Sequence, residues 1–248
     1  MKILVCISKT PDTTTKISFT ENSTKFNNDK VQFIINPYDE WYALVRAIEL
    51  KEKPSAAVTV TVINVGGADN DAIIRKALAI GGDDAVRIDA EPDDAFFVAD
   101  QIAQFARNEQ YDIILLGKET IDYNGSQVGG MIAGLLDLPF ISLASSLDLE
   151  GNSATVERDI SGGKEVLSVQ VPFVVSASKG MAEARIPNMR GIMAARTKPI
   201  KVLPPFASAK LTSVKKYDVP KEKAGPKMIS ADHPEELVSL LHNEARVI

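Results

Sequence analysis

The sequence lacks the residues that several common classes of site and fold require. It contains one cysteine, Cys6, so a disulfide framework is excluded and a reducing compartment is expected. Its two histidines, His233 and His242, have a spacing that fits no common zinc motif, so we expect no metal site. No apolar run approaches the roughly 20 residues of a membrane span, and MKILVCISK is too short for a signal peptide. We therefore expect a cytoplasmic protein, most simply a bacterial one, without membrane insertion.

Nucleic-acid binding and several kinds of catalysis also find little support. The net charge is −5 at pH 7, which argues against a nucleic-acid partner. G-x-G is absent, and the Gly-Lys pairs at 117–118 and 163–164 are each followed by Glu, so the dinucleotide fingerprint and the P-loop are both missing. A catalytic histidine would have to come from the last sixteen residues. The 33 acidic residues leave acid–base catalysis open, but no pair stands out by its spacing. We predict no catalytic residue.

Strand and helix patterns alternate along the first 150 residues. KILVCIS is a continuous apolar run, which is typical of a strand buried on both faces. The alternating segments KISF and VQFI between it and the first helix suggest a hairpin. We predict strands at 2–8, 57–67, 85–90, 111–117 and 140–151, and helices from Asn36-Pro37 to 53 and at 68–82, 93–110 and 127–136. This alternation favours an α/β fold with a doubly wound, mostly parallel sheet.

The pattern changes after residue 150. Residues 153–178 are predicted to form antiparallel strands around a turn at Gly162-Gly163. From residue 198 the chain is rich in Lys and Pro, which indicates an extended arm, and HPEELVSLLHNEA predicts a final amphipathic helix. A disordered tail is the alternative, but apolar residues recur through the arm. We therefore predict an α/β domain at 1–197 and, at 198–248, an arm and helix that pack on a partner subunit.

The loop GKETIDYNGSQVGG, residues 117–130, is the best candidate for a ligand site. It follows a predicted buried strand, and ligands of doubly wound sheets bind beyond the carboxyl ends of strands. Gly125 permits a tight turn, Ser126 is a suitable N-cap for the next helix, and Gly129 and Gly130 carry no side chains. Amides at a helix N-terminus attract phosphate, so we expect a nucleotide. An ordinary strand-to-helix connection capped by Ser126 is the alternative.

Six segments, taken in order, resemble the β subunit of electron transfer flavoprotein over nearly the whole chain. They are ILVCISKTPDT, INPYDEWYALVRAIELKE, INVGG, IRKALAIGGDDAVRI, DIILLGKETIDYNGSQVGGMIAGLLDLP and VVSASKGMAEARIPNMRGIMAARTKPI. The resemblance implies an adenine nucleotide alpha-hydrolase-like fold. It also implies a heterodimer that carries electrons from acyl-CoA and related dehydrogenases to a quinone-linked oxidoreductase.

The resemblance further implies two cofactors. The α subunit would supply most of the FAD site, which the β subunit would approach near Asp12-Thr13, and the β subunit would hold AMP. Val65 and Val128 stand where some relatives have Cys and Thr, so these two would contact AMP through backbone or packing. The residues implied to contact AMP are Cys6, Asn36, Pro37, Tyr38, Asp39, Val65, Gly117, Lys118, Glu119, Thr120, Ile121, Asp122, Tyr123, Asn124, Gly125, Ser126, Gln127 and Val128.

Residues 182–195 resemble the segment with which this family docks dehydrogenases. Met189 falls where the family has an anchoring leucine, and a flexible methionine fits several partner pockets. A basic flank that includes Arg185 could steer docking to an acidic surface. The family's N-E-P-R is replaced here by Ala182-Glu183-Ala184-Arg185, and an ordinary surface helix after Pro187 is the alternative. The residues implied to dock partners are Glu183, Arg185, Met189, Ile192 and Met193.

Three functions are compatible with these observations. The first is an electron carrier subunit with AMP and without catalytic side chains. The second is a bifurcating relative, in which the same pocket holds a second FAD and NADH is oxidised. Bifurcating members tend to have Gly-Asp-Thr-Ala where this chain has Tyr123-Asn124-Gly125-Ser126, which favours AMP. The third is a stand-alone nucleotide-dependent enzyme, which ranks last because the P-loop is missing.

Overall fold

A mixed, mostly parallel sheet organises the chain. In the computed structural model, which describes residues 1–54, 57–221 and 225–248, nine strands form this sheet in the order β11-β10-β9-β12-β8-β1-β6-β7-β13. All neighbours are parallel except β9–β10 and β10–β11. The strands are β1 Lys2–Cys6, β6 Thr59–Val65, β7 Asp84–Ile88, β8 Ile113–Gly117, β9 Phe140–Glu150, β10 Ser153–Ile160, β11 Gly163–Gln170, β12 Phe173–Ala177 and β13 Ile200–Leu203. The predicted α/β class and the antiparallel addition are confirmed, and the hydrolase-like classification stays a prediction.

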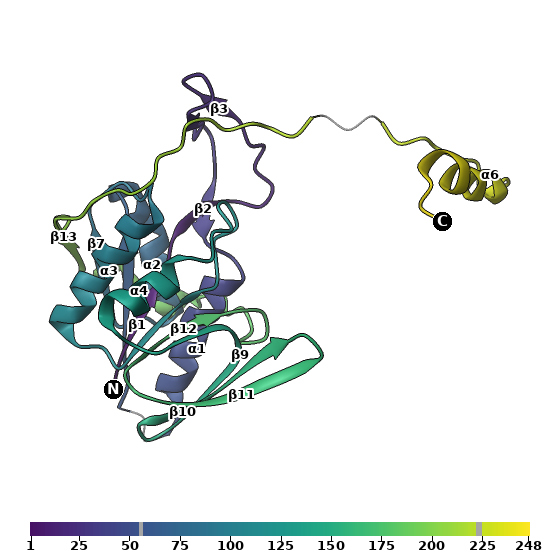
Figure 1. Cartoon of the computed structure of the whole chain (residues 1–248). Coiled ribbons are helices and arrows are strands. Elements are labelled where there is room, and N and C mark those ends of the chain that lie inside the picture. Colours follow the sequence, from purple (N-terminus) through teal and green to yellow (C-terminus); the bar gives the residue numbers. More distant parts are fainter. Residues whose placement is uncertain (55–56, 222–224) are drawn as a thin grey trace. The chain divides into compact units, whose positions relative to one another are not determined.

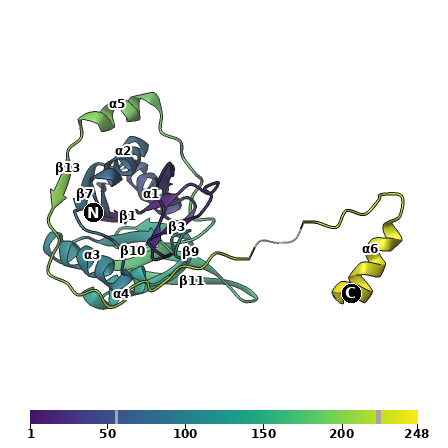
Figure 2. The same cartoon turned by 90° about the horizontal axis from the view of Figure 1, so that it is seen from above.

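Helices cover both faces of the sheet, as Figures 1 and 2 show. They are α1 Asp39–Glu52, α2 Asp71–Ile80, α3 Ala95–Glu109, α4 Val128–Leu136 and α5 Met189–Thr197. The buried residues of α1 and α2 join one core cluster, and those of α3 and α4 join another. Strand β1 contributes Ile3 and Val5 to the first cluster and Leu4 and Cys6 to the second. A strand between two helical layers needs apolar side chains on both faces, which explains the continuous apolar run.

The strand order changes direction at β1. Chain order runs outward from β1 through β6 to β7, and the connection through α3 then returns to β8 on the other side of β1. The helices that follow β1 and β8 therefore lie on opposite faces. In doubly wound folds, ligands bind beyond the carboxyl ends of the two strands at such a switch point. The loop at 117–127 follows β8 and lies at this edge.

The segment between β1 and α1 pairs differently from the prediction. Strand β2 Lys9–Pro11 pairs with β5 Phe33–Ile35, and β3 Phe19–Thr20 pairs with β4 Lys25–Phe26. The predicted hairpin of KISF with VQFI is therefore wrong. Residues 21–23 all have positive φ and form a tight turn, so β3 pairs with β4, the strand that follows it directly in the chain. A short loop costs less closure entropy than a long one.

The last strands also refine the prediction. β10 and β11 form the expected antiparallel pair around the Gly162-Gly163 turn. Strand β12 is instead parallel and inserts between β9 and β8, and all five of its residues are buried. Strand β13 then pairs with β7 at the sheet edge. The Gln101 amide exchanges two hydrogen bonds with the backbone of Phe206, and the Asp94 carboxylate accepts from the Thr212 amide at 2.8 Å. The start of the predicted arm is thus fixed on its own chain.

The described residues divide into two compact units, one of Met1–Ile17 with Asn27–Lys215 and one of Ser18–Phe26 with Lys216–Ile248. In the second unit the ring of Phe19 stacks on that of Tyr217 at 4.5 Å. The predicted C-terminal helix is present as α6 Pro234–Leu240 and a wider turn over Leu241–Ala245. The predicted division at 197/198 stays a prediction, and arm residues 222–224 lie outside the described residues.

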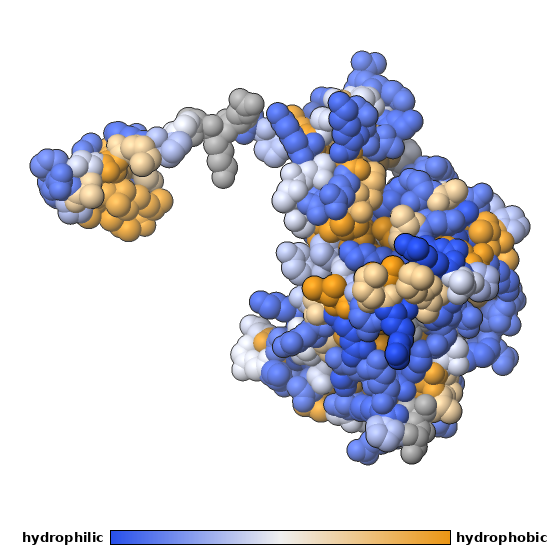
Figure 3. Space-filling view, turned by 180° about the vertical axis from the view of Figure 1, so that it is seen from behind, coloured by the Kyte–Doolittle hydropathy of each residue, from blue (hydrophilic) through white to orange (hydrophobic). Residues whose placement is uncertain are grey.

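The C-terminal helix of this unit carries an apolar face. Ile229, Leu237, Leu240 and Leu241 line a hollow of about 390 Å³, and Figure 3 shows an apolar patch on this helix. Leu237 and Val238 are 47% and 58% exposed. Within the described part of the chain, the search for helices long and apolar enough to cross a membrane found none.

Candidate functional site

The loop at 117–127 starts directly over the first turn of α1. A Cβ on Gly117 would lie 2.7 Å from Cγ of Glu40 and 2.8 Å from the Glu40 backbone nitrogen, so only glycine fits there. The Lys118 amide donates to the Ala177 carbonyl at 2.9 Å, which ties the loop to the end of β12. The close approach places the predicted loop residues beside the predicted group Asn36–Asp39.

Asn36 holds the loop with its side chain. The side chain is fully buried; its Nδ2 donates to the Glu119 carbonyl at 2.9 Å, and its Oδ1 accepts from the Ile121 amide at 3.0 Å. The backbone N–H of Asn36 donates to the carbonyl of Ser8, beyond the end of β1, at 3.1 Å. Both ends of the side-chain amide are therefore engaged by the chain itself. Asn36 positions the loop, and the direct contact with AMP that was predicted for it stays a prediction.

The loop tip presents a run of backbone donors. Asn124 and Ser126 have left-handed φ values of 49° and 50°, whereas Gly125 does not adopt this conformation. Within the part of the chain that the structure describes, the amides at 125–127 donate to no acceptor. The amides at 128–130 belong to the first turn of α4, where a helix offers no internal acceptor, and no side chain caps it. A string of free amides at the positive end of a helix is suited to an anion.

Ser126 does not cap this helix, so that prediction is wrong. Helix α4 begins at Val128 with Gln127 at the N-cap, and Ser126 Oγ donates instead to Glu119 Oε2 at 3.1 Å. Its left-handed backbone turns the side chain back toward the loop. Gly129 has a packing role as well, since a Cβ there would lie 2.9 Å from the ring of Phe140, which opens β9. At Gly130 the same atom would have room, with the ring 3.7 Å away.

Carboxylates lie beneath and beside the loop. Glu40 is buried and accepts hydrogen bonds from the Ser8 amide at 2.7 Å and the Ser8 hydroxyl at 2.8 Å. Burial raises the pKa of Glu40 to about 8, against the opposing effect of these hydrogen bonds. Burial likewise raises the pKa of Asp39 to about 6. At neutral pH Glu40 is therefore mostly uncharged, which lowers the repulsion that an anion bound at this loop would meet.

The remaining predicted residues lie around this loop with different surroundings. Cys6 is buried at the end of β1, and desolvation raises the pKa of its thiol far above the usual range, so the group is unreactive. Val65 is buried at the end of β6. Pro37 is half-buried, and Tyr38 is exposed with a φ of 67°. Residues 122–127 are exposed at the loop tip. Thr13 lies apart, in an exposed turn where Asp12 Oδ1 accepts from the Thr14 amide at 2.9 Å.

Three polar side chains at this edge of the sheet were not among the predicted site residues. Besides Glu40 and Ser8, Asn64 is buried and donates to the Ile7 carbonyl at 2.9 Å while accepting from the Asn70 amide at 2.8 Å. These bonds tie the end of β6 to the residue that follows β1. The available signal was a polar residue at the end of an apolar strand pattern, which Ser8 and Asn64 both are.

The second predicted site is the segment before and within α5. Asn188 caps the helix by accepting from the Gly191 amide at 2.8 Å. A Cβ on Gly191 would lie 2.2 Å from the Ala79 carbonyl oxygen, so α5 packs directly on the end of α2. Arg75 of α2 donates to the Ala195 carbonyl at 2.7 Å. The helix is therefore a fixed part of the first unit.

The five predicted docking residues differ in exposure. Met189 and Met193 are 72% and 56% exposed, and Glu183 is also exposed. Ile192 is half-buried and packs against the core, and Arg185 forms an ion pair with Glu52 of α1. Ile186, which was not predicted, is 85% exposed. The large exposed apolar side chains of this segment are thus Ile186, Met189 and Met193, which we call the docking surface after the role predicted for the segment.

Comparison with known proteins covers both sites. Residues 24–207 match the family described as electron transfer flavoprotein domain. The chain is 36% identical over 262 aligned residues to the electron transfer flavoprotein subunit beta of Bacillus subtilis, with all of both chains covered. It is 34% identical to the human protein of the same name, covering 100% of this chain and 99% of the relative. The corresponding protein of Syntrophomonas wolfei is 34% identical, with 95% and 92% covered.

Proposed function

This chain belongs to the electron transfer flavoprotein family, as a β subunit. From that premise we propose that it is an electron carrier subunit that uses the loop after β8 and the docking surface. A β subunit has an α subunit as its partner, and the family's β subunits are electron carriers. In this proposal the chain contributes no catalytic side chain. It holds a nucleotide, shapes part of a flavin site and presents a docking surface, and it does so in the cytoplasm.

The nucleotide is AMP, bound at the loop that follows β8. The amides at 125–130 offer donors for one phosphate group, and we expect the nucleoside to lie toward Cys6 and Val65, at the carboxyl ends of β1 and β6. The cation in the loop, Lys118, already lies 3.0 Å from the Glu119 carboxylate. A monophosphate suits this balance of charge better than a triphosphate, because Glu119 and Asp122 would repel further phosphates. Asn36 keeps the loop in place for this ligand.

The flavin is FAD, held mainly by the α subunit. When bound, FAD supplies the redox chemistry. The turn at Asp12–Thr15 is the part of this chain that we expect beside it, and the hydrogen bonds from Thr14 to Asp12 keep that turn closed. The C-terminal arm packs on the α subunit through the apolar residues of α6, because an exposed apolar face on a short helix gains by being covered.

The docking surface receives acyl-CoA dehydrogenases and related dehydrogenases, and a quinone-linked oxidoreductase takes the electrons onward. Two exposed methionines and an exposed isoleucine form an adaptable apolar anchor. Arg190 and Arg196 beside them are exposed, which favours an acidic partner surface. Electron carriers need short-lived complexes, and a small anchor meets that need better than a large interface.

The observation that carries the nucleotide proposal is the run of amides without acceptors between a strand end and a helix start. The test is to co-express the chain with its α subunit, denature the purified heterodimer and measure released FAD and AMP by chromatography. We expect FAD and AMP in equal amounts. Twice as much FAD without AMP, together with NADH oxidation, would instead identify a bifurcating protein. A heterodimer with no nucleotide besides one FAD would refute an occupied loop.

A further inference from the structure

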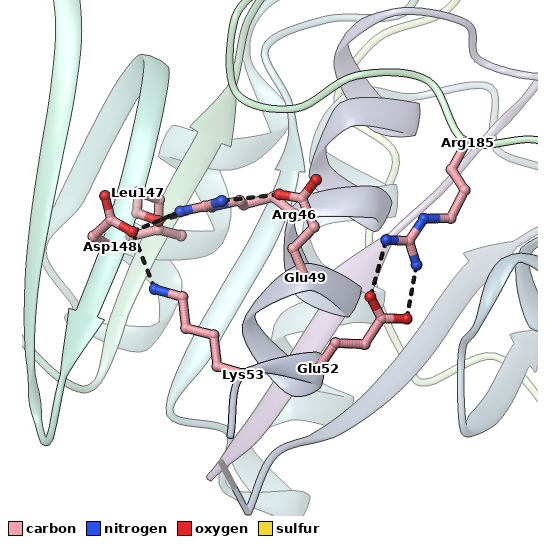
Figure 4. Close-up of polar contacts among 7 residues, drawn as sticks. All are labelled: Arg46, Glu49, Glu52, Lys53, Leu147, Asp148 and Arg185. Carbon is pink, nitrogen blue, oxygen red and sulfur yellow. Dashed lines mark hydrogen bonds and ion pairs between the residues drawn. The ribbon is translucent and has the colours of Figure 1, made fainter. Parts of the chain in front are cut away.

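Residues 182–187, within the segment that joins β12 to α5, form few hydrogen bonds with other elements. Met181 is buried at its start, and Asn188 begins α5 at its end. Between these two points, and among the described residues, Arg185 is the side chain with hydrogen bonds to another element. Its two terminal nitrogens donate to the two carboxylate oxygens of Glu52 at 2.8 and 2.9 Å, the fork that Figure 4 shows. A two-pronged contact of this kind fixes orientation as well as distance.

Glu52 is well placed to act as a fixed support. It is the last residue of α1, whose buried face lies in the core. The same half of α1 is bound to strand β9, because Arg46 donates to the Leu147 carbonyl at 2.8 Å and to the Asp148 carboxylate at 2.7 Å (Figure 4). A carboxylate at the C-terminal end of a helix opposes the helix dipole, so Glu52 contributes little to α1 itself. Its value lies in the contact with Arg185.

We propose that the Glu52–Arg185 ion pair positions the docking surface, so that Arg185 acts on its own chain and not on the dehydrogenase. The inference rests on the proposed function of that surface. Ile186 follows Arg185 directly and is 85% exposed, so the fork holds an apolar side chain outward without a core beneath it. A segment held before docking loses less conformational freedom when the partner binds. Both side chains are partly exposed, so the pair adds little to global stability.

The test is a double-mutant cycle on the purified heterodimer with Glu52→Gln, Arg185→Gln and both together. Flavin reduction is followed with an acyl-CoA dehydrogenase as the varied substrate. We expect each single variant to raise KM for the dehydrogenase about two- to five-fold, the range set by an exposed ion pair, with kcat unchanged. The double variant should show the same KM as either single one, because the pair acts as a unit. Amide hydrogen exchange at 182–188 should rise equally in all three.

Glu109→Gln is the matched control. Glu109 is the last residue of α3 and pairs with Lys201 at 3.5 Å, at a comparable exposure, so this change should leave KM and the exchange at 182–188 as they were. If Arg185→Gln raises KM further in the Glu52→Gln background, Arg185 contacts the dehydrogenase and the proposal is overturned. Unchanged exchange in Glu52→Gln overturns it as well. Met189→Ala tests the docking proposal separately from the ion-pair proposal. If this variant leaves KM unaltered, the docking proposal fails, while the exchange data still report on the ion pair.

Discussion

Replacing Asn36 with alanine is expected to release AMP from the heterodimer while FAD stays bound. The substitution removes the two hydrogen bonds to the Glu119 carbonyl and from the Ile121 amide. A buried polar group that loses its partner costs about 1–3 kcal/mol. Since Glu119 and Ile121 are half-buried, values near the low end apply, and the two groups together cost about 2–3 kcal/mol.

That cost sets the size of the effect on the nucleotide. At 1.4 kcal/mol per tenfold, it shifts the equilibrium between the held and the released loop by about 30- to 150-fold. Apparent affinity falls as the binding-competent fraction falls, so AMP retention weakens by up to this factor. Asn36→Asp should behave like the alanine variant. An aspartate still accepts from the Ile121 amide but faces the Glu119 carbonyl with a second acceptor.

The assay is the ratio of AMP to FAD released from the heterodimer after extended dialysis, with affinity measured by adding AMP back. Asn152→Ala is the control, because this asparagine is exposed in the turn between β9 and β10. We expect a low ratio for both Asn36 variants and a normal ratio for the control. An Asn36→Ala heterodimer that keeps AMP with normal affinity would show that the loop is held by its other contacts, and the positioning role of Asn36 would be refuted.

Three further predictions concern the buried acid, the docking surface and the arm. Burial raises the pKa of Glu40 from about 4.5 to about 8, so the folded chain holds this proton more tightly than the unfolded chain, and stability is lost as the pH rises between these values. Glu40→Gln should remove this dependence of stability on pH. Its Tm should be above that of the wild type at pH 8.5 and close to it at pH 5. Met189→Ala should raise KM for the dehydrogenase with flavin content intact, and loss of flavin would mean that the segment is structural. Truncation after Lys215 should prevent assembly with the α subunit while the remaining chain keeps its circular dichroism and cooperative melting, and a normal heterodimer would contradict our interpretation of the arm.

The last of these variants shows how the structure changes a design based on sequence. The Lys- and Pro-rich composition after residue 198 suggests an arm, and truncation after Ile200 would follow from that interpretation. Three of the four residues of strand β13 and the hydrogen bonds to Gln101 and Asp94 lie beyond that point, so the shorter chain would lose an edge strand and uncover α3. Composition reports that the segment is rich in Lys and Pro. It does not report that the backbone of this segment adds an edge strand to a sheet formed by earlier parts of the chain.

Periodicity predicted most of the sheet because each parallel strand carries its own signal. The apolar run of β1 and the glycine pair after α2 are local features, and Gly81 ends that helix with a φ of 151° as a glycine should. The pairing of β2 with β5 depends on residues more than twenty positions apart, and the alternation of KISF and VQFI does not specify partners. The prediction that Ser126 caps α4 was wrong for a related reason, because capping depends on a backbone angle that the residue type does not determine.

The position of the candidate site was predictable from strand ends, whereas the roles of its residues were not. Asn36 and Arg185 were both predicted to face a ligand or a partner, and both side chains are engaged by their own chain. A polar residue beside a site is equally compatible with binding and with support in the sequence alone. Burial and partner atoms separate the two, which is why Glu40, a charged residue in a helix, emerged only from the structure.

Helix α1 brings these supporting contacts together. Asn36 precedes its first turn and donates a hydrogen bond to the loop at 117–127. Glu40 within that turn accepts hydrogen bonds from Ser8, and Glu52 at the far end of the helix accepts them from Arg185. The middle of the helix is buried in the core and cannot shift without disturbing it. The proposed carrier function uses no catalytic side chain, so in that proposal the chain contributes through the geometry of its sites. One rigid helix that supports the nucleotide loop at one end and the docking segment at the other supplies that geometry, and the separate effects expected for Asn36→Ala on AMP and for Glu52→Gln on KM follow from their places at its two ends.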